Sequence, residues 1–130
     1  MIAEYAFLLG RIIFGGYFLQ AAYNHFSKLT AMSGYAAGRG VPAPKLAVFA
    51  TGVLLLLGGL GVLLGAYVHW ALLCLAVFLA GVTPAMHSFW RDADPGQKMG
   101  NTVNFAKNLA LLGAVLMMYL LPLPWPFGLR

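Results

Sequence analysis

The chain has 130 residues, of which 62% are hydrophobic and 8% are charged. With a mean hydropathy of +0.83, this shortage of charge excludes an ordinary soluble domain, in which about a quarter of the residues are charged. The net charge is +5, but the basic residues stand between apolar runs and form no basic tract. They therefore indicate orientation in a membrane and contact with lipid headgroups, and no nucleic-acid partner is expected.

Four apolar segments are long enough to cross a bilayer as helices, which takes about 20 residues each. They cover residues 3–23, 46–64, 69–86 and 103–121. The first segment has no basic start and no small-residue cleavage pattern, so it is interpreted as a span and not as a signal peptide. Because the connectors are short, we predict one all-α domain over residues 1–130, an antiparallel bundle of four transmembrane helices.

The connector after the first span predicts a short interfacial helix over residues 29–37, followed by a turn at Pro42 and Pro44 into the second span. Within the second span, Gly61 and Gly65 form a GxxxG pair, which is a weak signal for helix association. A homo-oligomer is therefore left open.

Arg11 lies well inside the first span, where a charged side chain is costly and usually faces protein or water. Glu4 lies two helical turns earlier on the same face. Two interpretations are open: an intramembrane charge pair of Glu4 with Arg11, or an arginine that extends to the interface and anchors the helix.

The connectors between spans one and two and between spans three and four carry most of the basic residues. These are Lys28, Arg39, Lys45, Arg91 and Lys98. The positive-inside rule predicts that both connectors are cytoplasmic and that both termini lie outside. We expect a multi-pass protein of a bacterial cytoplasmic membrane.

Antiparallel topology gathers polar residues from distant parts of the chain at this cytoplasmic end, around the polar stretch of residues 84–108. The predicted set is Asn24, His25, Lys28, His87, Trp90, Asn104, Lys107 and Asn108. It predicts binding of a small polar or anionic headgroup. The alternative is a collar that satisfies helix ends. Lys107 favours function, because a charge inside an apolar run is expensive.

Other chemistries have less support in the sequence. His25 and His87 have matching depth for axial haem ligation, but His69 lies at the other end and no HxxxH or carboxylate-rich pattern exists. Neither haem nor another metal is expected. Ser88 follows His87 without an orienting acid, so no nucleophilic triad is predicted. His87 is the one candidate for catalysis.

Several short motifs resemble one family in order along nearly the whole chain. They are GR at Gly10 and Arg11, GVPAP from Gly40 to Pro44, GG at Gly58 and Gly59, HSFW at 87–90 and NFAKNLALLG at 104–113. The pattern resembles the DoxX family of small four-helix membrane proteins. The resemblance implies these family positions: Arg11, Lys28, Pro42, Pro44, Gly58, Gly59, His87, Trp90, Lys107 and Asn108.

The chain departs from the family pattern at Leu55, where members often carry a glutamate shortly before the GG pair. The family name comes from a subunit associated with thiosulfate:quinone oxidoreductase, so the resemblance implies a quinone-linked redox setting. We therefore expect an accessory subunit that binds a quinone or an anionic lipid headgroup and docks a membrane or cytoplasmic partner. One alternative is a quinone-handling oxidoreductase, with His87 as proton donor and Lys107 as electrostatic clamp. Another is a structural bundle or small carrier without catalysis.

Overall fold

The computed structural model describes residues 1–129, which form helices and connecting segments without a strand, as predicted. The elements are α1 (Ile2–Ser27), α2 (Leu29–Gly38), α3 (Pro44–Leu64), α4 (Val68–Met86), the one-turn 3₁₀ helix η1 (Phe89–Arg91) and α5 (Pro95–Tyr119). Helices α1, α3 and α5, together with α4 continued through η1, are long and apolar enough to cross a membrane. The predicted short helix between the first two spans is present as α2.

The helix that contains the fourth predicted span begins before it. α5 starts at Pro95 and not at residue 103, because Asp94 caps the helix. The Asp94 carboxylate accepts a hydrogen bond of 2.9 Å from the backbone N–H of Gln97, and Pro95 occupies the first helical position, where its missing N–H costs nothing. The polar first turns of α5 are therefore helix and not loop.

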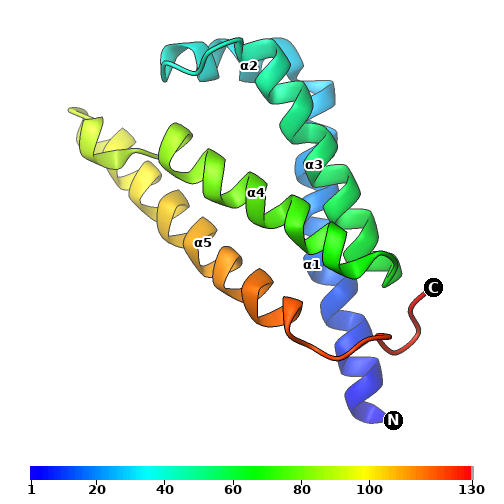
Figure 1. Ribbon diagram of the computed structural model, residues 1–130. Helices are drawn as coiled ribbons and strands as arrows, with labels where there is room; N and C mark the ends of the chain where they lie inside the picture. Colours follow the sequence, from blue (N-terminus) through cyan, green and yellow to red (C-terminus); the bar gives the residue numbers. More distant parts are fainter. Residues whose placement is uncertain (130) are drawn as a thin grey trace.

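The helices form two pairs that meet at one end and spread at the other (Figure 1). α1 packs along α3, and α4 packs along α5. Near the ends of the chain α3 and α4 are in close contact, with no room for a side chain at two glycines of α3. An added Cβ at Gly58 would lie 2.4 Å from Leu75, and one at Gly61 would lie 2.2 Å from Ala71. Toward the other end the pairs diverge, and α2 lies across the opening (Figure 1). The end of the bundle where the helix pairs meet is called the termini end, and the end where they spread apart is called the α2 end.

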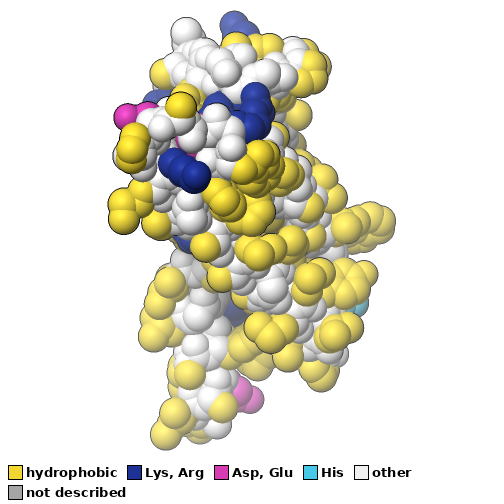
Figure 2. Space-filling view, turned by 90° about the vertical axis from the view of Figure 1, so that its left-hand side faces the viewer, with side chains coloured by type: hydrophobic (Ala, Val, Ile, Leu, Met, Phe, Trp, Pro, Cys, Tyr) yellow, Lys and Arg dark blue, Asp and Glu magenta, His cyan; other side chains and the backbone are white. Residues whose placement is uncertain are grey.

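The core lies between α1, α3, α4 and the C-terminal half of α5, and it is apolar. Its buried members include Phe18, Leu55, Leu72, Leu75 and Val115. Leu55 is fully buried, so the position at which family members often carry an acid is part of the hydrocarbon core here. The outside of the bundle is also apolar over most of its length, and Lys and Arg side chains gather toward the α2 end (Figure 2). This distribution suits a protein with a lipid-facing belt.

At the termini end, Arg11 is 3% exposed and donates hydrogen bonds to three backbone carbonyls. Two belong to the last turn of α3, Val62 at 3.1 Å and Leu63 at 2.8 Å. The third belongs to Pro126 in the C-terminal tail. Glu4 is exposed, and the ion pair found within residues 1–129 joins Arg39 to Asp92. The Glu4–Arg11 pair is thus not formed, because the guanidinium nitrogens donate to the carbonyls of Val62, Leu63 and Pro126.

The tail folds back over the same helix end. The N–H of Leu129 donates to the carbonyl of Leu64 at 2.8 Å, which satisfies another carbonyl of the last turn of α3. Trp125 is 3% exposed and packs edge-on against Phe7 at 5.1 Å between ring centroids. The Trp125 ring is therefore part of the core.

Candidate functional site

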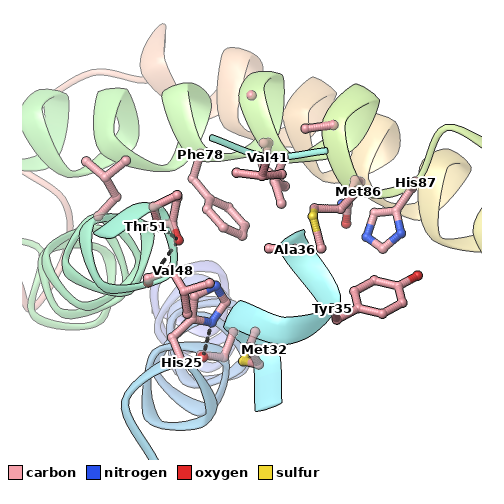
Figure 3. A pocket seen from close by; sticks show the side chains of 18 of the residues that line it. His25, Met32, Tyr35, Ala36, Val41, Val48, Thr51, Phe78, Met86 and His87 are labelled. Carbon is pink, nitrogen blue, oxygen red and sulfur yellow. Dashed lines mark hydrogen bonds between the residues drawn. The ribbon is translucent and has the colours of Figure 1, made fainter. Parts of the chain in front are cut away.

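A cavity of about 660 Å³ lies beneath α2, where the two helix pairs spread apart. All five α-helices contribute to its wall. Most of the lining is apolar, with Met32, Val48, Phe78 and Met86 among the side chains that point into it (Figure 3). Its volume lies within the range of roughly 300–1,000 Å³ that is usual for small-molecule sites.

The predicted polar set is divided between the cavity and its surroundings. Five of its members line the cavity: His25, Lys28, His87, Lys107 and Asn108. The other three, Asn24, Trp90 and Asn104, are not part of the lining. The structure thus brings residues of α1, the end of α4 and α5 into one site, from positions more than 80 residues apart in the chain.

Lys107 is one of the two lysines that line the cavity, with Lys28. It lies at the middle of α5 and faces Tyr17 of α1, with Nζ 5.7 Å from the ring centroid. Its nearest hydrogen-bond acceptor is Oδ1 of Asn104, at 3.4 Å. Because α5 begins at Pro95, Lys107 lies several turns from the start of the helix. No carboxylate lines the cavity within residues 1–129, so an anionic or electron-rich ligand is the partner that suits this ammonium group.

His25 contributes a ring of fixed orientation to the opposite wall. Its Nδ1 lies 2.9 Å from the carbonyl oxygen of Ala21, one turn earlier in α1 (Figure 3). Since a carbonyl only accepts, Nδ1 carries the hydrogen. The ring packs edge-on against Phe78, with 5.9 Å between centroids.

Trp90 points away from the cavity. Helical spacing would place Thr83, His87 and Trp90 on one face only if α4 continued through Trp90, but α4 ends at Met86. The turn of η1 carries Trp90 outward, where it is 56% exposed and packs against Phe89 and Phe105. A stacking role for Trp90 toward a ligand in this cavity is therefore not supported.

A network of polar side chains, which the sequence does not reveal, holds α2 in place over the cavity. Arg39, at the end of α2, donates to Oδ1 of Asp92 and to Oγ of Ser88, each at 2.7 Å. The side chains of Arg39 and Asp92 are 10% and 3% exposed. Asn101 of α5 donates to the other oxygen of Asp92 at 2.7 Å. The network thus ties α2 to the α4–α5 pair.

Acidification should weaken the hydrogen bonds that Asp92 accepts from Arg39 and Asn101. The pKa of Asp92 lies below its usual value because Asn101 and Arg39 both donate hydrogen bonds to the carboxylate. A lowered pKa in the folded state means that the stabilisation is present above about pH 4, the usual Asp pKa, and is lost as the pH falls through the folded-state pKa. We expect the thermal midpoint to fall more steeply from pH 5 to pH 3, roughly the range of Asp titration, in wild type than in Asp92→Asn. Equal slopes in differential scanning fluorimetry would contradict this, and Asp94→Asn is the control.

Taken together, the fold and the site define a class: a multi-pass α-helical membrane protein whose apolar, basic-edged cavity opens between two helix pairs. Comparison with family models assigns residues 6–88 to DoxX, and the chain belongs to the DoxX family. The match includes α1 to α4 and ends at Ser88, so Lys107 and Asn108 lie beyond it. No curated protein and no solved structure matches the chain.

Proposed function

We propose that this chain is an accessory subunit of a quinone-linked membrane redox system, and that its cavity binds a quinone headgroup or the headgroup of an anionic lipid. The observation that supports this most strongly is the cavity itself. It has apolar walls for an isoprenoid or acyl chain, and it has Lys28, Lys107 and Asn108 as donors for oxygen atoms. Most of its wall lies within the membrane-spanning helices, so a lipid-soluble ligand can reach it.

The charge distribution supports an orientation in a bacterial cytoplasmic membrane. The α2 end carries Lys28, Arg39, Lys45, Arg91 and Lys98. By the positive-inside rule this end faces the cytoplasm, and both termini lie outside. A partner protein would then meet the cavity end from the cytoplasm or from the neighbouring bilayer. The aromatic cluster of the half-buried Phe89 and Phe105 with the exposed Trp90 is an apolar feature at that end.

Substitution of Lys107 tests the proposed ligand class. In nanodiscs of neutral lipid, decylubiquinone should quench the protein's intrinsic fluorescence with saturation, and phosphatidylglycerol should compete with it. Lys107→Gln should weaken the binding of both about tenfold, because one charge-assisted hydrogen bond is lost. Lys98→Gln is the matched control, since Lys98 lies on the same helix outside the cavity.

Two results would count against the proposal. One is the absence of saturable binding of either compound to the wild-type protein. The other is an unchanged affinity in Lys107→Gln, which would mean that the ligand does not meet this ammonium group.

A second candidate function, a quinone-handling enzyme, is favoured by the position of His87 in the cavity wall beside Asn108 and Lys107. The two functions differ in one measurable property. An enzyme would turn over a quinone couple as the purified chain, and His87→Ala would remove that turnover. An accessory subunit would bind the quinone without turnover.

A further inference from the structure

The hydrogen-bond chain that begins at Arg39 continues to the cavity wall. Arg39 donates to Asp92 at 2.7 Å, and Asn101 donates to the same carboxylate at 2.7 Å. The other end of the Asn101 amide, Oδ1, lies 3.2 Å from Nδ1 of His87. Asn101 is 5% exposed, so its amide has no room to exchange these partners for water.

The donor and the acceptor of each hydrogen bond between Arg39, Asp92, Asn101 and His87 follow from the chemistry of the groups. An ionised carboxylate only accepts hydrogen bonds, so the NH₂ group of Asn101 must face Asp92. Its carbonyl oxygen, also an acceptor only, then faces His87, and Nδ1 of His87 must carry the hydrogen. In the neutral ring this leaves Nε2 with a free lone pair. The ring lines the cavity (Figure 3), so Nε2 is the ring nitrogen available to a ligand.

His25 also carries its hydrogen on Nδ1, but its hydrogen-bond partner is a backbone carbonyl. Its Nδ1 donates to the carbonyl of Ala21, so its Nε2 is also an acceptor when the ring is neutral. The two imidazoles of the cavity therefore present acceptor nitrogens, whereas Lys28 and Lys107 present donors. A ligand headgroup that fills this site must both donate and accept hydrogen bonds.

We propose that the cavity prefers a headgroup with a hydroxyl that donates to Nε2 of His87, and hence the reduced, quinol form of a quinone couple over the oxidised form. Asn101, Asp92 and Arg39 are positioning residues that hold the His87 tautomer. This inference rests on the proposed function, because it describes the ligand of the same cavity.

The first part of the test concerns the ring and needs no ligand. In protein labelled with ¹⁵N-histidine, the His87 signals, assigned by their loss in His87→Gln, should show hydrogen on Nδ1 and a free Nε2. Asn101→Leu, which has nearly the same shape, should lose this tautomer. Thr102→Val, an exposed neighbour on α5, should keep it. An Nε2–H ring at His87 in wild type would overturn the inference.

The second part compares decylubiquinol with decylubiquinone under argon in neutral-lipid nanodiscs. Wild type should bind the quinol about fivefold more tightly, as expected for one additional hydrogen bond, and Asn101→Leu should lose this preference. Equal wild-type affinities for the two forms would overturn the inference and leave the proposed function standing. Failure of both forms to bind would instead contradict the quinone part of the proposed function, and the preference with it. The wild-type comparison does not depend on whether Asn101→Leu folds.

Discussion

Replacement of Arg11 by leucine is expected to lower the free energy of unfolding by about 3 kcal/mol or more, because it leaves buried carbonyl groups without their donors. The substitution removes the donors for the carbonyls of Val62, Leu63 and Pro126. Each buried polar group left without a partner costs roughly 1–3 kcal/mol. The arginine also places a positive charge at the C-terminal end of α3, where the helix dipole favours it.

Titration with SDS, followed by the fluorescence of buried Trp125, is the suitable measurement because the tail is held by the same guanidinium. Arg91→Leu is the matched control. Arg91 is exposed and makes a single long contact of 3.4 Å, so its loss should change stability by no more than about 0.5 kcal/mol. If the two leucine variants unfold at the same SDS fraction, the clamp at Arg11 does not stabilise the fold as described.

Replacement of Gly81 by phenylalanine should abolish ligand binding while the fold is kept. Gly81 lies on α4 in the cavity wall, and an added Cβ there meets no heavy atom within 4 Å. A phenylalanine ring can therefore occupy cavity space without displacing the backbone. We expect the affinity for decylubiquinone to fall by at least about tenfold, with an unchanged thermal midpoint.

The control for this variant is Gly113→Phe. Gly113 lies on α5, is equally free of neighbours within 4 Å and is not part of the cavity lining. Both variants place the same ring on a membrane-spanning helix, so they share any general effect of added bulk. Full binding by Gly81→Phe, or equal loss in both variants, would show that the ligand does not occupy this cavity.

The membrane spans could be predicted from the sequence because apolar runs of sufficient length have few other uses. The start of α5 could not be predicted from hydropathy. Gln97, Lys98 and Asn101 are polar, yet this stretch is helical because Asp94 supplies the cap and Pro95 the first helical position. Those two residues were the local signal that marks the true start.

The convergence of His25, Lys28, His87, Lys107 and Asn108 follows from antiparallel topology, and it could be predicted for that reason. Trp90 was misplaced because its predicted direction depends on a helix that in fact ends before it. A 3₁₀ turn changes the angle between successive side chains, so helical spacing no longer predicts a shared face.

The partners of the two buried arginines lay beyond sequence reasoning for different reasons. Arg11 binds backbone carbonyls, which every residue possesses, so no side-chain pattern identifies them. Arg39 and Asp92 are 53 residues apart, and only the position of α2 across the helix pairs brings them together. Ser88 and Asn101 join the network for the same reason.

The central claim is that a lipid-soluble ligand occupies the cavity beneath α2, and photo-cross-linking tests it most directly. A photoreactive ubiquinone analogue would be irradiated with the wild-type protein in native membrane vesicles, and labelled residues would be mapped by mass spectrometry. We predict labels on Met32, Phe78 and Met86, suppressed by excess decylubiquinone. Labels spread along the lipid-facing surface, or confined to Tyr67 and Trp70 at the termini end, would contradict the claim.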